Sequence, residues 1–398
     1  MALIEWVVVL GLYDLKISTL LKPTILLNIV VLIVISNFAI LVIAEKNIVL
    51  YLEKISGVLR CQKIAKRYSR IFYILLVLGI FSFVVTLELY GFTVLNQNKV
   101  SRTKLAYGYF YNGLIVCCIY FYYLFRIKKM FFKRLWHLMA CLLCLILLGF
   151  LLNRGSLLYI ATGILLLETL LYYNRKKSAF LSRKFFLVLL GSGIFFIFIF
   201  GYVGELRFQY VGQNVYHMSF MELYGFNKGF PSGLGQIYIY LTSPLENFSY
   251  VLERETINNY HGFANLFYPQ IKLFANLVGR GDEFAAWLNS SYELYPILLN
   301  KAGLNVMSFL ADAYMDFGFL GILIYLLFYD GVIIFAKNVL KSKLYGISKV
   351  IIYSMLLQII IWSPFVNSVF KLGVVWVNIF FIVVADVFAR KIKIGQRK

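Results

Sequence analysis

The chain has 398 residues, of which 61% are hydrophobic and only 14% are charged, and its mean hydropathy is +0.80. This composition excludes an ordinary soluble globular protein, in which about a quarter of the residues carry a charge. The formal net charge of +21 does not indicate nucleic-acid binding, because the basic residues lie mainly in short connectors between apolar runs. Membrane insertion and anionic lipid headgroups account for positive charge in such positions.

Ten apolar runs are candidates for helices that cross a hydrocarbon core about 30 Å thick. In chain order they cover residues 2–12, which is short, 24–44, 71–90, 105–125, 135–152, 156–173, 185–203, 319–336, 350–369 and 372–389. The sequence therefore predicts an all-α polytopic membrane protein with about ten transmembrane helices.

Lysine and arginine residues predict how these helices are oriented, because they are retained on the cytoplasmic side of a membrane. Five connectors hold 26 of the 39 basic residues, and all five fall on one side if the ten helices alternate in direction. These connectors are residues 45–70, 126–134, 174–184, 337–349 and 390–398. Both termini are then cytoplasmic, and the longest segment without an apolar run lies outside.

That outer segment covers residues 204–316 and separates an N-terminal bundle of seven helices, 1–203, from a C-terminal bundle of three, 317–398. It contains ten of the 18 acidic residues and four of the six prolines. An amphipathic stretch rich in Tyr and Phe, 234–250, predicts a helix that lies in the membrane interface. A single large outer loop is the place where chemistry on a water-accessible substrate is expected.

Three arginines near the predicted outer face are candidates for binding an anionic group, because a guanidinium binds phosphate oxygens with two parallel hydrogen bonds. Arg154 lies in the turn 153–155 between two predicted helices, Arg207 follows the seventh helix, and Arg280 lies between two glycines. Each also has a plainer interpretation. Arg154 is then a side chain that reaches the lipid headgroups, Arg207 part of a solvated helix end, and Arg280 an ordinary turn residue.

Three other residues are candidates for a general base. His261 is one of two histidines in the outer segment, and an imidazole, with an ordinary pKa of about 6.5, suits proton transfer at neutral pH. Glu205 lies two residues before Arg207, and Asp316 lies four residues after Asp312, so the two aspartates share a helix face. Such a pair suits acid/base or metal chemistry, but a single hydrogen bond or a helix cap is an equally good interpretation. Structural roles compete with the assignments of His261 and Glu205 as well.

Several catalytic signatures are absent from the sequence. It contains no HExxH or DxD motif, no Cys/His cluster with zinc spacing, no phosphate-binding GxxxxGK, no GxGxxG and no GxSxG nucleophile motif. A reaction that needs neither a metal nor a bound cofactor is therefore favoured.

Two segments resemble a known family. The stretch SPLENF at 243–248 and the stretch NVMSFLADAYMDFGFLG at 305–321, together with Arg154 in its tight turn, resemble the Wzy-type O-antigen and capsular oligosaccharide repeat-unit polymerases. The number of predicted helices, the cytoplasmic termini and the single large outer loop are similar as well. Some of these polymerases carry an arginine followed ten residues later by a glycine in two outer loops, and the arginines of this chain do not have that spacing.

The resemblance implies a glycosyltransferase of the bacterial inner membrane that acts in surface polysaccharide biosynthesis. Its substrate is an oligosaccharide carried on undecaprenyl diphosphate, and the growing glycan is transferred to a hydroxyl group of the next lipid-linked unit at the outer face. The three arginines are then expected to bind the diphosphate, and His261, Glu205 and Asp316, in that order, are the candidates to accept the proton. Membrane lipids are partners, and a chain-length regulator protein is a further candidate partner.

Other functions fit parts of the sequence. An O-antigen ligase uses the same lipid-linked donor with a different acceptor, and the sequence does not separate it from a polymerase. A lipid-linked oligosaccharide flippase or another transporter is expected to have more helices, internal repeats and charges at mid-membrane, whereas here the charges gather beside one long outer loop. A structural or sensory membrane protein is the remaining class.

Overall fold

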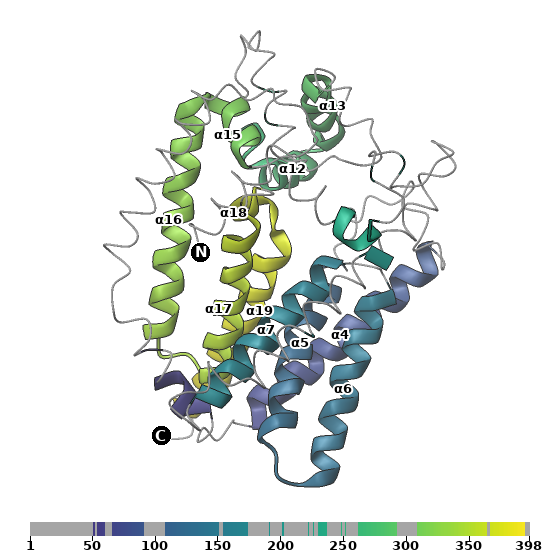
Figure 1. The fold of residues 1–398 in the computed structure, drawn as a ribbon, viewed down its shortest axis with the longest axis vertical. Coiled ribbons are helices and arrows are strands. Elements are labelled where there is room, and N and C mark those ends of the chain that lie inside the picture. The colour runs from purple at the N-terminus through teal and green to yellow at the C-terminus, as the bar shows by residue number, and fades with distance from the viewer. Residues whose placement is uncertain are drawn as a thin grey trace. The chain divides into compact units, whose positions relative to one another are not determined.

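The computed structural model describes part of the chain, and every regular element in that part is a helix (Figure 1). This confirms the all-α class predicted from the sequence. The described residues are 51, 54–59, 66–90, 108–150, 154–173, 191, 201–202, 222, 226, 230–236, 248, 251, 262–292, 309–363 and 367–394.

The described helices form two groups along the chain. The first group consists of α4 (Lys66–Tyr90), α5 (Gly108–Ile127), α6 (Phe131–Phe150) and α7 (Arg154–Tyr173). The second group consists of the short 3₁₀ helix η5 (Gly262–Ala264) and α12 (Tyr268–Leu277), α13 (Gly281–Tyr292), α15 (Phe309–Phe317), α16 (Phe319–Lys341), α17 (Gly346–Trp362), α18 (Ser368–Lys371) and α19 (Gly373–Ile394).

Seven of the ten apolar runs coincide with described helices, and the protein is an α-helical membrane protein. Four helical segments are long and apolar enough to cross a membrane: Tyr68–Glu88, Phe110–Ile127, Phe131–Gly149 and Phe319–Lys341. Shorter apolar helices cover Ser156–Leu171, Gly346–Ile360 and Gly373–Ala389. The predicted helices 2–12 and 24–44 and nearly all of 185–203 lie outside the described residues.

The ninth predicted helix is shorter than its apolar run. α17 ends at Trp362, although the run continues to residue 369. Pro364 in the sequence explains the early end, because proline lacks a backbone N–H and disfavours the helical conformation of the residue before it. The next helix, α18, has its own cap, since the Asn367 side chain accepts a hydrogen bond from the Phe370 N–H at 3.4 Å.

The chain divides into two compact units, each built from three separate stretches. The first unit contains Met1–Glu45, Phe195–Ile334 and Ile359–Gly373. The second unit contains Lys46–Ile194, Phe335–Gln358 and Val374–Lys398. Each unit therefore draws on residues from both the N-terminal and the C-terminal parts of the chain.

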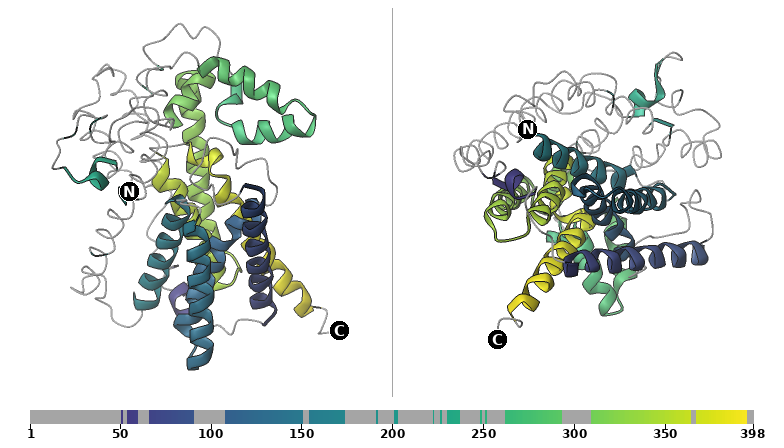
Figure 2. Two further views of the ribbon diagram at one scale, coloured as in Figure 1. Left: turned by 90° about the vertical axis from the view of Figure 1, so that its right-hand side faces the viewer. Right: turned by 90° about the horizontal axis from the view of Figure 1, so that it is seen from below.

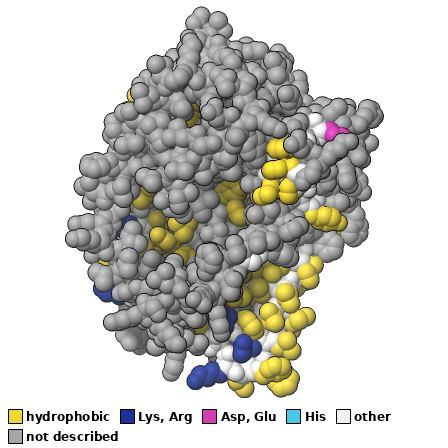
Figure 3. Space-filling model, viewed as in Figure 1, with side chains coloured by type: hydrophobic (Ala, Val, Ile, Leu, Met, Phe, Trp, Pro, Cys, Tyr) yellow, Lys and Arg dark blue, Asp and Glu magenta, His cyan; other side chains and the backbone are white. Residues whose placement is uncertain are grey.

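In the second unit α5 is the central helix and packs against α4, α6 and α7. Residues 114–121 of α5 are buried without exception, as expected for a helix that is apolar on all sides. α6 instead has an exposed apolar face, on which Phe132 is 84% exposed and Trp136 is 63% exposed. Hydrophobic side chains cover this part of the surface in Figure 3, with Lys and Arg side chains at its lower edge. Lipid contact accounts for such a face in a membrane protein.

Contacts at one end of the second unit join helix ends that are far apart in the sequence. The hydroxyl groups of Tyr68, near the start of α4, and Ser348, near the start of α17, are 2.7 Å apart. Asp386, near the end of α19, accepts hydrogen bonds from the Ser348 hydroxyl (2.9 Å) and the Tyr345 backbone N–H (2.8 Å). The ends of α4, α17 and α19 that adjoin basic connectors therefore meet.

The ends of α5 and α7 belong to the same cluster. Arg126 of α5 donates two hydrogen bonds to Glu168 of α7, at 2.5 and 2.9 Å. Tyr120 of α5 is hydrogen-bonded to Ser69 of α4 at 2.8 Å, which connects this pair of helices to the start of α4. Helix ends beside all five basic connectors are thus gathered at one end of the unit.

Replacing Asp386 with Ala is expected to lower the free energy of unfolding by about 1–3 kcal/mol, because the buried Ser348 hydroxyl and the partly buried Tyr345 N–H lose their acceptor. Thermal unfolding of the detergent-solubilised protein, followed by circular dichroism, measures the change. The control is Asp282→Ala, which removes an exposed carboxylate of α13 and is expected to change stability by less than about 0.5 kcal/mol. Equal effects of the two substitutions would contradict this role of Asp386.

Candidate functional site

The candidate site lies in the first unit, where α15 folds back on α16. Gly318 connects the two helices with a φ of +61°, a left-handed conformation that glycine adopts without the steric cost of a side chain. The ring of Phe309, in the first turn of α15, stacks on Tyr325 of α16 with centroids 4.3 Å apart. The first turn of α15 therefore lies against α16, and α15 is seen beside the upper end of α16 in Figure 1.

A second glycine allows this close packing. A Cβ atom at Gly321 of α16 would collide with the carbonyl oxygen of Ala313 in α15, so a larger residue there would push the helices apart. As a result, α15 lies against the first turns of α16, and both of its aspartates, Asp312 and Asp316, have no exposed surface. Two buried carboxylates require partners inside the protein, because a buried charge without a partner is strongly destabilising.

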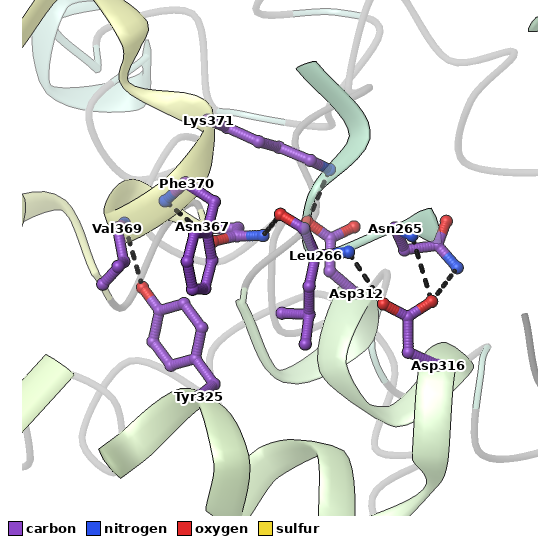
Figure 4. A network of polar contacts seen from close by, with 9 residues as sticks. All are labelled: Asn265, Leu266, Asp312, Asp316, Tyr325, Asn367, Val369, Phe370 and Lys371. Carbon is purple, nitrogen blue, oxygen red and sulfur yellow. Dashed lines mark hydrogen bonds and ion pairs between the residues drawn. The ribbon is translucent and has the colours of Figure 1, made fainter. Parts of the chain in front are cut away.

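Asp316 binds the turn that follows η5 (Figure 4). Its Oδ1 accepts hydrogen bonds from the Asn265 backbone N–H (3.0 Å) and from the Asn265 side-chain amide (2.9 Å). Its Oδ2 accepts a third from the Leu266 backbone N–H (2.8 Å). One carboxylate thus satisfies two backbone donors of a buried turn and fixes that turn against α15.

Burial raises the pKa of the Asp316 carboxyl from its ordinary value of 3.8 to about 6, although the hydrogen bonds from Leu266 and Asn265 act in the opposite direction. Both oxygens of Asp316 are occupied as acceptors in these contacts. The geometry gives Asp316 a structural role in holding the turn, and its role as a general base stays a prediction.

Asp312 forms an ion pair with Lys371 of α18, with its Oδ2 2.5 Å from the Lys371 Nζ. Burial raises the pKa of the Asp312 carboxyl, and the Lys371 ammonium opposes that rise. The Lys371 side chain keeps 24% of its surface exposed, whereas that of Asp312 has none. The pair therefore presents a cation at a partly open position, held in place by a buried carboxylate.

Asn367 closes the cluster from the other side. Its side-chain amide donates a hydrogen bond to the Leu266 carbonyl oxygen at 3.0 Å, so both backbone polar groups of Leu266 are bound by side chains. The Gln270 amide of α12 adds a contact to the Phe370 carbonyl oxygen at 3.0 Å. Figure 4 shows how the contacts of Asp312, Asp316 and Asn367 join three segments of the chain, the turn after η5, α15 and α18.

The residues that the sequence suggested as site residues are only partly described. Arg280 lies at the turn between α12 and α13, where its side chain is 77% exposed and 3.8 Å from Glu283. Arg154 is the first residue of α7, and its side chain lies outside the described part of the structure. Glu205, Arg207 and His261 also lie outside the described residues, so their roles stay predictions.

Sequence reasoning missed Lys371, Asn367 and Asn265. A signal for Lys371 was present, because it lies between the ninth and tenth apolar runs, in a short connector on the predicted outer side. Like Arg154, Lys371 is a cation in a tight turn on the predicted outer side. Asn367 and Asn265 carry no such signal, since their partners are distant in the sequence.

The cluster is suited to binding an anionic group and to orienting a nearby segment. Asp312 and Asp316 bring two carboxylates together, but no set of three His, Cys, Asp or Glu side chains with the geometry of a metal site occurs among the described residues. Lys371 is the cation that the geometry makes available. An ammonium at a partly buried position interacts more strongly with phosphate oxygens than an exposed one does.

No known family model, curated protein sequence or solved structure matches this chain significantly. The function is therefore inferred from the residues and the geometry of the chain itself.

Removing one partner of the Asp312–Lys371 pair is expected to lower the free energy of unfolding more than replacing both partners. Lys371→Met leaves Asp312 buried without its cation and should destabilise the protein by about 3–5 kcal/mol, whereas Lys371→Met combined with Asp312→Asn should recover most of that loss. Thermal unfolding in detergent of the two single variants and the double variant forms a mutant cycle. Additive losses in the double variant would show that the two side chains do not interact.

The raised pKa of Asp316 predicts a pH-dependent stability. Its folded-state pKa of about 6 lies above the ordinary value of 3.8, so the folded protein keeps this proton where the unfolded chain has released it. The resulting stabilisation is complete below about pH 4 and is lost as the pH rises through about 6, a decline of about 2–3 kcal/mol.

Chemical unfolding of the wild type and of Asp316→Asn between pH 4 and pH 7 measures this decline. The amide does not titrate, so the difference in stability between the two proteins is expected to change with pH by that amount. Parallel stability curves would rule out a raised pKa for Asp316.

Proposed function

We propose that this protein polymerises oligosaccharide repeat units carried on undecaprenyl diphosphate at the outer face of a bacterial inner membrane. A hydroxyl oxygen of the acceptor unit attacks the anomeric carbon at the reducing end of the growing glycan. The bond between that carbon and the diphosphate oxygen breaks, and the lipid diphosphate leaves with the bonding electrons. The proton of the acceptor hydroxyl passes to a base on the protein. The donor is already activated, so the reaction needs no nucleotide.

The ion pair of Lys371 with Asp312 is the observation that carries this proposal. A leaving diphosphate gains negative charge in the transition state, and a positioned cation stabilises that charge. Lys371 is such a cation: Asp312 holds its Nζ at 2.5 Å, and part of its surface stays exposed. The pair lies beside α16, which is long and apolar enough to cross a membrane, where a lipid-linked substrate has access.

The direction of α16 supports an outer location for this cluster. The helix ends beside the five basic connectors lie together, and such connectors are retained in the cytoplasm. α16 ends at Lys341, beside one of these connectors, and therefore begins at the opposite membrane face. We therefore expect the α15–α16 junction and Lys371 toward the outer face, where repeat units would be joined.

Asp316 has a positioning role in the proposed site. It fixes the backbone of Asn265 and Leu266, and His261 lies four residues before Asn265 in the sequence. His261 is the first candidate for the base that accepts the proton, with Glu205 second. Arg154, Arg207 and Arg280 are proposed as further cations for the diphosphate.

The surface glycans and lipid-linked intermediates of a strain that lacks the protein test this proposal. A polymerase predicts that single repeat units still reach the cell surface while the ladder of polymer lengths disappears. Polymer that accumulates on its lipid carrier would indicate a ligase, which uses the same donor. Repeat units trapped on the inner leaflet would indicate a flippase, and an unchanged profile would refute a role in this pathway.

Complementation of the same strain tests the role of Lys371. The double variant Asp312→Asn, Lys371→Met keeps the site neutral but lacks the cation. It is expected to restore less than about a tenth of the wild-type polymer. This loss corresponds to about 1.4 kcal/mol of transition-state stabilisation. Lys343→Met, which removes an exposed lysine of the α16–α17 connector, is the control and should restore the full ladder. Full restoration by the double variant at equal protein levels would exclude Lys371 from the reaction.

A further inference from the structure

α12 and α13 form a hairpin that is anchored at one end and exposed at the other. The three-residue turn 278–280 joins the helices, and Gly279 adopts a φ of +76° there. The rings of Tyr268 and Phe284 stack between the two helices with centroids 5.9 Å apart. The hairpin extends to one side near the upper end of the molecule in the left view of Figure 2.

The anchored end of the hairpin lies beside the membrane-spanning part of α16. Phe267, which directly precedes α12, packs on Phe370 at a centroid distance of 4.2 Å and on Phe328 of α16 at 6.0 Å. Phe328 is nine residues beyond the start of α16, which corresponds to about 13 Å along the helix. The base of the hairpin therefore lies beside the apolar span Phe319–Lys341, in the part nearer the start of α16.

The free end of the hairpin carries three exposed apolar side chains, and the charged residues Arg280, Asp282 and Glu283 follow them. Phe274 is 68% exposed, Leu277 is 74% exposed and Val278 is 72% exposed. These three residues lie in the last turn of α12 and directly after it, and we call them the apolar tip. Arg280 follows directly, and its only described ion pair is a long contact of 3.8 Å with Glu283.

We infer that the apolar tip inserts into the lipid of the adjacent membrane leaflet, with Arg280 at the level of the lipid phosphate groups. Contact of these three apolar side chains with water is unfavourable relative to burial, whereas contact with lipid is not. The hairpin starts at membrane depth and leads away from the bundle, so lipid is the medium that it meets. Arginine near an apolar segment places its charge at the headgroups and its stem in the apolar region.

This inference does not depend on the proposed glycan transfer. It assigns to the hairpin a role as a second membrane contact, beside the spanning helices, that fixes the outer segment against the bilayer. The α12 contacts at Gln270 and Phe267 then hold that segment to α18, next to Lys371.

Site-directed fluorescence in liposomes tests the inference. The fluorophore NBD is attached to Leu277→Cys. The matched control is NBD attached to Glu283→Cys, on the other side of the turn 278–280. Both purified full-length proteins are reconstituted in phosphatidylethanolamine–phosphatidylglycerol vesicles. Wild-type protein treated in the same way gives the background from the five native cysteines. Quenching is then compared between doxyl-labelled lipid and aqueous iodide.

Insertion predicts that doxyl lipid quenches the probe at residue 277 at least twofold more than the probe at residue 283, and that iodide shows the reverse order. Quenching of residue 277 by iodide alone would overturn the inference and place the tip in water. Protection from both quenchers would also overturn it, because a protein surface would then cover the tip. Phe274→Cys repeats the measurement, so the result does not depend on one variant folding correctly.

Discussion

Asp312 and Asp316 are buried on a helix that folds back along a membrane-spanning helix, and this burial constrains everything around them. A buried carboxylate without a partner costs several kcal/mol, so α15 is stable in its position only if other segments supply donors. Lys371 supplies one and the backbone of Asn265 and Leu266 supplies the others. The fold-back of α15, the turn after η5 and the position of α18 therefore depend on one another.

This interdependence connects the fold to the proposed chemistry. The same contacts that satisfy the aspartates leave a lysine partly exposed beside an apolar helix and fix the turn that follows His261 in sequence. Two glycines make the arrangement sterically possible, Gly318 at the fold-back and Gly321 at the helix crossing. The proposed site for a lipid diphosphate thus arises from the requirement that buried charges be paired, and the α12–α13 hairpin is proposed as its additional contact to lipid.

The sequence predicted the helices well because a membrane-spanning helix satisfies its own backbone hydrogen bonds and needs a long apolar run. α17 ended early because Pro364 breaks a run that remains apolar. The contacts of the site were not predictable, since Asp316 binds a residue 51 positions away and Asn367 binds one 101 positions away, and local patterns do not encode such pairs. Lys371 was within reach of the charge argument that selected Arg154. The division into 1–203, 204–316 and 317–398 and the roles of His261, Glu205 and Arg207 stay predictions.

The most direct test of this account is the binding of undecaprenyl diphosphate to the purified protein, measured by native mass spectrometry on the wild type and on the double variant Asp312→Asn, Lys371→Met. The account predicts that the wild type binds the diphosphate in preference to undecaprenyl monophosphate and that the double variant binds it at least about tenfold more weakly, a loss of about 1.4 kcal/mol. Equal binding by the two proteins, with both folded, would contradict the claim that this buried pair forms a diphosphate site.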